Sequence, residues 1–238
     1  RETMTREELE SWYQRLLDSY HKWLSYQMKW REERNRSMEK LEFPFIYRKG
    51  QKEMVAGIYH AISRKEQIFI QAPTGVGKTM SAVFPAVRSI GEGKAETLFY
   101  LTARTITRTV AQDAFEILRK NGLLFKTVTI TAKEKLCFCE KPECNPETCP
   151  YAKGHYDRIN DAVYELWTNE QSFDRETILR QAEKWQVCPF EMSLELSVWM
   201  DAVICDYNYV FDPNVYLKRF FGENISGKYL FLIDEAHN

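Results

Sequence analysis

A glycine-rich turn between an apolar run and an amphipathic segment limits most strongly how this chain can fold. The turn reads Ala-Pro-Thr-Gly-Val-Gly-Lys-Thr at residues 72–79, with alanine where the general phosphate-binding pattern has its first glycine. Gly75 and Gly77 allow a tight turn with inward-pointing N–H groups, and the following helix adds the positive end of its dipole. Lys78 can reach the β- and γ-phosphates, and the Thr79 hydroxyl can bind Mg²⁺. The turn therefore predicts a phosphate-binding loop between a strand and a helix.

The rest of the chain alternates between strand-like and helix-like patterns. Apolar runs without polar alternation predict buried strands at residues 67–72, 97–102, 125–131, 202–205 and 229–233. Helical spacing of apolar residues predicts helices at residues 51–63, 78–90 and 106–120. This order predicts an α/β fold on a parallel sheet, interrupted by an irregular, proline-containing insertion across residues 137–188.

A long helix is predicted before this region, over residues 5–40. Thr5 and Glu8 form a capping-box pattern, and apolar residues follow at helical spacing, whereas residues 31–36 are strongly charged. Such a helix would span about 50 Å. We interpret it as a packing or linking helix whose charged end faces solvent, with a coiled-coil partner as the alternative.

An acidic pair follows the last predicted strand. An Asp at the end of a buried strand can hold Mg²⁺ beside the Thr79 hydroxyl. Asp234 stands at that position, so we predict that it is a Mg²⁺ ligand. The neighbouring Glu235 can orient an attacking water and accept its proton. The predicted catalytic residues are therefore Lys78 and Glu235, and the predicted Mg²⁺ ligands are Thr79 and Asp234.

Composition excludes some classes of protein. With 44% hydrophobic and 28% charged residues, the chain has the composition of a folded protein rather than a disordered tail. A net charge of −1 excludes a histone-like excess of positive charge, although a local basic strip remains compatible with it. No apolar run reaches the roughly 18–20 residues of a membrane span, and no signal peptide opens the chain. We therefore expect a cytoplasmic protein with no membrane partner.

In this order, the motifs resemble those of superfamily 2 helicases, and the cysteines between them narrow the resemblance to the iron–sulfur helicases related to XPD and DinG. Three other segments are similar to that family, at residues 43–51, 100–105 and 206–213. The resemblance covers roughly residues 43–238. It implies an incomplete RecA-like first motor domain at residues 43–134 and 189–238, an iron–sulfur insertion at residues 135–188 and a helical lead-in at residues 1–42.

The same resemblance implies ATP-dependent unwinding of DNA, with 5′ to 3′ movement on a single strand. In this family a glutamine before the phosphate loop reads adenine, and Gln51 stands at that position. ATP and Mg²⁺ are the expected cofactors of the motor. The predicted ATP-binding residues are Arg48, Gln51, Thr74, Gly75, Val76, Gly77, Lys78 and Thr79.

Six cysteines need an explanation, because four of them fall within thirteen positions, from Cys137 to Cys149. The resemblance implies that a 4Fe–4S cluster is held by Cys137, Cys144, Cys149 and Cys188. Cys139 is left spare and could exchange with Cys137, while Cys205 fits a small core residue in a strand. A structural zinc site is the main alternative, although the chain has no close Cys-x₂-Cys pair of the kind that zinc knuckles favour.

DNA contact is predicted where the chain is locally basic. Residues 94–135 hold eight Lys or Arg against four Asp or Glu. A helix is expected to begin there just past a strand end, where backbone N–H groups and hydroxyls can hold phosphate. Arg119 and Lys120 are interpreted instead as a solvated helix face. The predicted DNA-binding residues are Thr102, Arg104, Thr105 and Arg108.

Two other classes of protein remain as alternatives. One is a P-loop switch ATPase without unwinding, which leaves the cysteine insertion unexplained, and the other is a non-catalytic DNA-binding module, which has no use for Lys78 and Glu235. By resemblance, a second motor domain supplies an arginine to the γ-phosphate. We therefore expect further domains in the full-length protein, single-stranded or forked DNA as its partner, and weak nucleotide binding with almost no hydrolysis by this chain alone.

Overall fold

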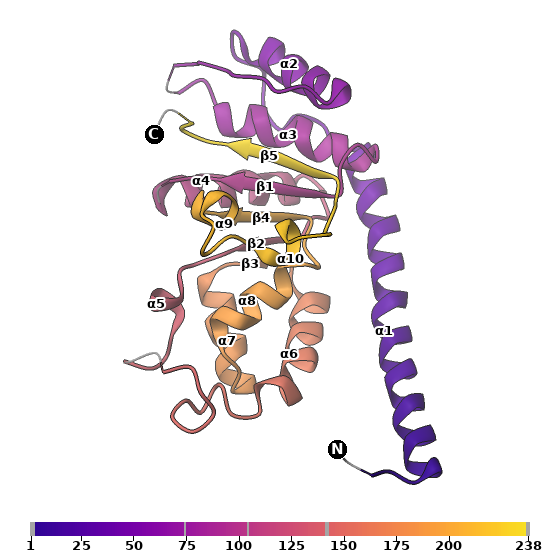
Figure 1. The fold of residues 1–238 in the computed structure, drawn as a ribbon. Coiled ribbons are helices and arrows are strands. Elements are labelled where there is room, and N and C mark those ends of the chain that lie inside the picture. Colours follow the sequence, from indigo (N-terminus) through magenta and orange to yellow (C-terminus); the bar gives the residue numbers. More distant parts are fainter. Residues whose placement is uncertain (1–2, 74, 104, 141–142, 237–238) are drawn as a thin grey trace.

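The computed structural model describes residues 3–73, 75–103, 105–140 and 143–236. Its centre is a parallel sheet with the strand order β3-β2-β4-β1-β5 (Figure 1). The strands are β1 (Thr97–Leu101), β2 (Thr127–Thr129), β3 (Ser172–Phe173), β4 (Ala202–Cys205) and β5 (Tyr229–Ile233). The predicted α/β class with a parallel sheet is confirmed, because every pairing in the sheet is parallel.

Helices surround the sheet and complete the layers. The helices are α1 (Arg6–Glu39), α2 (Gln51–Arg64), α3 (Lys78–Gly91), α4 (Thr105–Lys120), α5 (Lys133–Leu136), α6 (His155–Asn169), α7 (Arg175–Trp185), α8 (Pro189–Ser197), α9 (Asn208–Phe211) and α10 (Lys218–Phe221). None of the helices in the described part of the chain has the length and apolar character needed to cross a bilayer.

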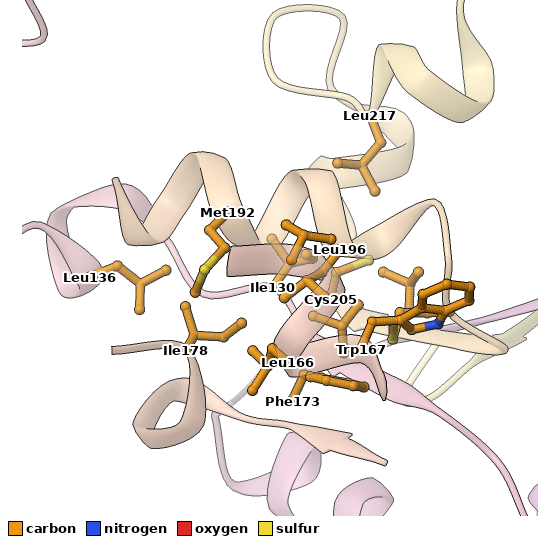
Figure 2. Close-up of a cluster of buried hydrophobic side chains, with 14 of the residues drawn as sticks. Ile130, Leu136, Leu166, Trp167, Phe173, Ile178, Met192, Leu196, Cys205 and Leu217 are labelled. Carbon is orange, nitrogen blue, oxygen red and sulfur yellow. The ribbon is translucent and has the colours of Figure 1, made fainter. Parts of the chain in front are cut away.

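Alternate residues of the strands point into two separate hydrophobic cores. On one face, β1 contributes Leu98 and Tyr100 to a core with α3 and α4. On the other, Phe99 and Leu101 join a core built with α6, α7 and α8. Figure 2 shows this second core, where Trp167 of α6 lies among aliphatic side chains. Burial on both faces explains why β4 and most of β1 are continuously apolar rather than alternating.

The predicted strand at residues 67–72 is wrong. That segment is extended, but it makes no ladder with the sheet, which ends at β5 within the described residues. Ile68, Phe69 and Ile70 are all exposed, with Phe69 at 87%. An apolar run identifies a segment that suits a strand, but it does not specify a partner, and only a neighbouring backbone completes the ladder.

The insertion is more regular than its sequence predicts. Residues 137–188 contain α6 and α7, and β3 between them pairs with β2 in parallel register. The irregular part is confined to the cysteine-bearing stretch before Gly154, whose left-handed φ of 67° precedes α6. The insertion therefore contributes its own strand to the sheet, and its helices α6 and α7 lie beside the β3 edge (Figure 1), where they share a hydrophobic core with the sheet.

The first helix confirms the predicted capping box, in which Thr5 accepts from the backbone N–H of Glu8 and its own N–H binds the Glu8 carboxylate. Most of its charged end faces solvent as predicted, since Arg31, Glu32, Glu33 and Arg36 are exposed. The other face of that end is docked, because Arg34 pairs with the buried Asp201, to which Trp30 Nε1 also donates at 3.4 Å. The apolar first half is largely exposed and stands away from the domain (Figure 1).

Candidate functional site

The phosphate loop has the turn geometry that its glycines predict. Gly75 and Gly77 have φ values of 84° and 78°, in the left-handed region that glycine adopts without strain. Lys78 begins α3, and its ammonium folds back on the loop to donate to the carbonyl of Ala72 at 3.1 Å. Val76 lies between the glycines, whereas Thr74 falls outside the described residues. The loop is thus shaped to present backbone N–H groups and a cation to an anion.

Residues before the loop in sequence are packed against it. The Arg48 guanidinium donates to the carbonyl of Gly75, and the Arg48 backbone N–H donates to Gln51 Oε1 at 2.8 Å. Gln51 is only 5% exposed, and a Cβ at Gly77 would lie 2.5 Å from its Nε2 atom. Close approach of the Gln51 amide is therefore a second reason for glycine at position 77. The structure thus brings Arg48 and Gln51, the two predicted nucleotide-binding residues that precede the loop, into contact with it.

The two predicted Mg²⁺ ligands meet at the carboxyl ends of β1 and β5. The backbone N–H of Asp234 donates to the carbonyl of Leu101 at 2.9 Å, which extends the ladder by one residue. Tyr100 of β1 donates its hydroxyl to Asp234 Oδ2 at 3.0 Å, and the side chain of Thr79 lies beside the same hydroxyl. Burial and the charge of Asp234 raise the pKa of Tyr100, so its hydroxyl keeps its proton at neutral pH.

We call the three side chains Thr79, Tyr100 and Asp234 the nucleotide edge. An oxygen from a hydroxyl and one from a carboxylate, side by side at a phosphate loop, fit the hard oxygen ligands that Mg²⁺ prefers. The sequence did not single out Tyr100, because a tyrosine in an apolar strand is normally a core residue. Its place at the last but one position of β1 was the only available signal.

The residue after Asp234 lies in an unusual backbone conformation. Glu235 has a φ of 55°, which side chains other than glycine adopt rarely, and it lies in a turn directly after β5. Burial, followed by the charges of Asp234 and Glu235, raises the pKa of Tyr207. The Tyr207 hydroxyl also donates to the carbonyl of Asp234. The predicted base, Glu235, therefore lies in a turn that Tyr207 supports, beside the nucleotide edge. Backbone strain of this kind is common in functional sites.

Two of the predicted DNA-binding side chains are buried. Thr102 is fully buried and its hydroxyl hydrogen-bonds that of Thr107. Arg108 is 8% exposed and pairs with Asp206, while its Nε atom has no partner within the described residues. A phosphate contact by Arg108 therefore requires that ion pair to open.

Of the other two predicted DNA-binding residues, Arg104 lies outside the described residues, and Thr105 is the first residue of α4. Arg119, which we interpreted as solvated, is buried instead and donates to Thr127 Oγ1 at 2.6 Å and to the carbonyl of Gln171 at 3.0 Å. Lys120 is exposed as expected, but the interpretation was wrong for Arg119, which reaches from α4 to β2 and to the residue before β3.

Five of the six cysteines line one pocket. We call it the cysteine pocket, and its thiols belong to Cys137, Cys139, Cys144, Cys149 and Cys188. The expectation for the remaining cysteine is confirmed, since Cys205 is fully buried within β4. Five thiols around one cavity meet the chemical demand of an iron–sulfur cluster, which is held by four thiolates. Among the described residues, no three His, Cys, Asp or Glu side chains are arranged to hold a single metal ion.

Elements from both ends of the insertion bring these thiols together. Cys137 follows α5, and Cys188 caps the N-terminus of α8, where its own N–H donates to His155 Nδ1 at 3.2 Å. Burial raises the pKa of the Cys188 thiol, while the backbone N–H groups of Glu191 and Phe190 act in the opposite direction. These N–H groups are suited to support a thiolate at this position.

Within the pocket the thiols form two groups. The Sγ atoms of Cys139 and Cys149 are 3.9 Å apart. Cys144 lies near Cys188 and hydrogen-bonds the ammonium of Lys133, an interaction that raises the pKa of Lys133. Cys139, which the sequence left spare, thus lies inside the pocket with the four predicted ligands.

Known proteins resemble this chain in both sequence and fold. A profile described as DEAD_2 matches residues 119–238, and one described as DEAD/DEAH box helicase matches residues 48–145. A Caenorhabditis briggsae protein, "Regulator of telomere elongation helicase 1 homolog", is 23% identical over 85% of this chain and 24% of its own length. The Gallus gallus "Fanconi anemia group J protein homolog" is 32% identical over 39% of this chain and 7% of its own length.

A solved structure shares the fold. The structure titled "XPD_Helicase" aligns with 80% of this chain and 33% of its own chain, at 16% identity and a TM-score of 0.54. The human protein "Regulator of telomere elongation helicase 1" is 22% identical over 83% of this chain and 20% of its own length. The chain thus spans about a quarter of the length of the curated relatives that match most of it.

Proposed function

The chain belongs to the DEAD_2 family, and on that premise we propose that the protein containing it is an ATP-dependent DNA helicase. The matches also confirm the predicted resemblance to XPD-like superfamily 2 helicases. The observation that carries the proposal is the nucleotide edge, where Thr79 and Asp234 meet beside the phosphate loop through Tyr100. Because the chain spans only about a quarter of its curated relatives, further domains are expected in the same protein.

The proposed roles at the nucleotide edge follow from charge and position. Backbone N–H groups of the loop and the start of α3 bind the phosphates, and the Lys78 ammonium neutralises their charge. Thr79 and Asp234 would hold Mg²⁺, which supplies charge neutralisation at the β- and γ-phosphate oxygens. Glu235 orients the attacking water and accepts its proton. In this proposal Gln51 reads the adenine, and Arg48 supports the loop from the same side.

DNA is the proposed track of the motor. Helix α4 begins at Thr105, just past the carboxyl end of β1, where Tyr100 reaches the nucleotide edge. Arg104 and Thr105 are kept as proposed DNA contacts. Thr102 and Arg108 lie on the same segment of the chain. A DNA strand bound there would therefore be connected to the proposed Mg²⁺ ligands through β1. Single-stranded or forked DNA is the proposed partner, with 5′ to 3′ movement, and the cytoplasm is the proposed location. A flat response of DNA affinity to salt concentration would contradict binding through phosphates.

The cysteine pocket is proposed to hold a 4Fe–4S cluster through Cys137, Cys144, Cys149 and Cys188. Such a cluster ties the start of α8 to the loop that follows α5, and so stiffens the insertion beside the motor. Structural zinc is the alternative, and the two are distinguished by metal analysis of an anaerobically purified protein. Iron with sulfide supports the cluster, whereas a colourless protein with one zinc contradicts it.

The test of the proposed function is Lys78→Ala in the intact protein. Loss of this preorganised cation should lower ATP hydrolysis by about 10²- to 10³-fold and abolish unwinding, while DNA binding remains. Lys228→Ala is the matched control, because Lys228 is exposed at the opposite end of β5. Hydrolysis without unwinding in the unmodified protein would favour a switch ATPase, and DNA binding without hydrolysis would favour a non-catalytic module.

We also expect the isolated chain of 238 residues to bind ATP with Mg²⁺ weakly and to hydrolyse it barely. In this proposal a second motor domain supplies a cation to the γ-phosphate. Rapid DNA-stimulated hydrolysis by this chain alone would contradict that part of the proposal.

A further inference from the structure

One polar group at the nucleotide edge has no role in the function proposed above. The hydroxyl of Tyr100 is buried between α3 and β5, with the residue only 2% exposed, and it contacts both Asp234 and Thr79. Its ring belongs to the hydrophobic core on that face of the sheet. A phenylalanine would fill the same space, so the hydroxyl itself needs a reason.

The hydrogen-bond inventory fixes the direction of each bond. An ionised carboxylate can only accept, so the Tyr100 hydroxyl must give its single proton to Asp234 Oδ2. Burial raises the pKa of Tyr100, and the Thr79 side chain acts in the opposite direction, as a hydroxyl that donates to Tyr100 does. The protons therefore run from Thr79 to Tyr100 to Asp234.

This direction matters for a cation. A hydroxyl binds Mg²⁺ through an oxygen lone pair, and its proton must point away from the cation. A proton that Thr79 gives to Tyr100 leaves the lone pairs of the Thr79 oxygen free for a cation. The bond to Oδ2 similarly fixes the carboxylate of Asp234, whose other oxygen is left to serve as a ligand.

We propose that Tyr100 is a positioning residue that orients the Thr79 hydroxyl and the Asp234 carboxylate for Mg²⁺. The inference rests on the proposed function, because it concerns the same two proposed Mg²⁺ ligands. A second contact supports it, because the Tyr207 hydroxyl donates to the carbonyl of Asp234. Asp234 is thus held by Tyr100 at its side chain and by Tyr207 at its backbone.

The test compares Tyr100→Phe with the unmodified intact protein, by titration of a fluorescent ATP analogue with and without Mg²⁺. In EDTA the affinity for the analogue should stay within about twofold, because the core ring is retained. The Mg²⁺ concentration that half-saturates the tight-binding state should rise by about tenfold, the size expected for loss of a hydrogen bond to a charged group. Tyr229→Phe is the matched control and should shift neither value, since Tyr229 lies at the other end of β5.

Two results would overturn the inference. One is an unchanged Mg²⁺ requirement in Tyr100→Phe, and the other is an equal loss of affinity in EDTA, which would show a purely structural role. Thr79→Ala separates this failure from failure of the proposed function. If Thr79→Ala raises the Mg²⁺ requirement and Tyr100→Phe does not, only the positioning role is lost; if neither raises it, the proposed Mg²⁺ site is also wrong.

Discussion

The nucleotide edge and the cysteine pocket lie in one chain but are held in place by different means. At the nucleotide edge, ladder bonds of a parallel sheet carry Tyr100 and Asp234 to neighbouring strand ends. In the cysteine pocket, the thiols lie on turns, such as the one in which Cys149 donates its N–H to the carbonyl of Asn145 at 3.0 Å. The sheet therefore sets the geometry of the first site, whereas the geometry of the second depends more on what the thiols bind.

This difference predicts different responses to losing one ligand. Residues in a hydrogen-bonded ladder keep their positions when a neighbour changes, because the backbone holds them. Thiols on turns lose a shared constraint when the group that joins them is lost, since metal binding and local folding are coupled.

The largest effect is expected for Cys188→Ser. Replacing one of the four proposed thiolate ligands should abolish the visible absorption band of the proposed iron–sulfur cluster, while affinity for the ATP analogue stays within about twofold because the sites are independent. Cys205→Ala is the control and should keep the band, since Cys205 is buried in β4 away from the pocket. Loss of nucleotide affinity together with the band would break the comparison.

The next effect is expected at Asp201, where α1 is joined to the rest of the protein. We call this contact the junction. Its buried carboxylate pairs with Arg34 and accepts from the backbone N–H of Lys126 at 2.7 Å and from Trp30. Asp201→Ala leaves these donors without a partner and should lower the free energy of unfolding by about 3–5 kcal/mol, measured by urea denaturation. Asp161→Ala, at an exposed site on α6, is the control. A loss no larger than that of the control would show that α1 is not held at this junction.

A smaller effect is expected from pH, through Lys126. Its ammonium is buried, donating to the carbonyls of Trp167 and Glu170, and burial lowers its pKa to about 8. An unfolded lysine titrates near 10.4, so between these values the unfolded state binds more protons than the folded state. The free energy of unfolding contributed by this group should therefore rise from pH 8 to pH 10, by at most about 1.4 kcal/mol per pH unit.

The measurement for Lys126 is a difference, because other groups titrate in the same range. Lys126→Met should lack the rise, so the unmodified protein minus the variant isolates it. A difference that stays flat or falls between pH 8 and pH 10 would show that the ammonium keeps an ordinary pKa.

The smallest effect is expected for Cys139→Ser. Because four other thiols line the pocket, the absorption band should remain. The informative comparison is between Cys137→Ser alone and the double variant that carries both Cys137→Ser and Cys139→Ser. If Cys139 can exchange with Cys137, the single variant retains part of the band and the double variant loses all of it. Loss of the band in Cys139→Ser alone would place Cys139 among the four ligands.

Sequence reasoning reached the parts of the molecule that obey a local rule. The strands at residues 202–205 and 229–233 were predicted with the bounds of β4 and β5, because buried parallel strands are continuously apolar. The meeting of Thr79 and Asp234 was predictable, since both follow from motifs placed on strand and helix ends. Four of the five thiols in the pocket were predicted to lie together, although the presence of Cys139 among them was not.

What the sequence could not predict depends on partners that are distant along the chain. The apolar segment at residues 67–72 suits a strand, but the sheet ends at β5. Arg108 looks like a phosphate ligand until Asp206 is brought beside it. Arg34 looks as solvated as its charged neighbours on α1 until Asp201 is placed beside it. In each of these cases local charge or periodicity was read correctly, and tertiary contacts decided the outcome.

The docking of α1 also creates an optical signal. Trp23 of α1 stacks on Trp167 of α6 with ring centroids 5.3 Å apart, and Trp199 lies 4.7 Å from Trp23 and 5.1 Å from Trp167. Indole rings at such distances couple their electronic transitions, which gives strong near-ultraviolet circular dichroism. Movement of α1 away from the insertion would remove one ring of the three. The protein therefore carries a built-in chromophore that reports, without any label, whether its first helix is seated.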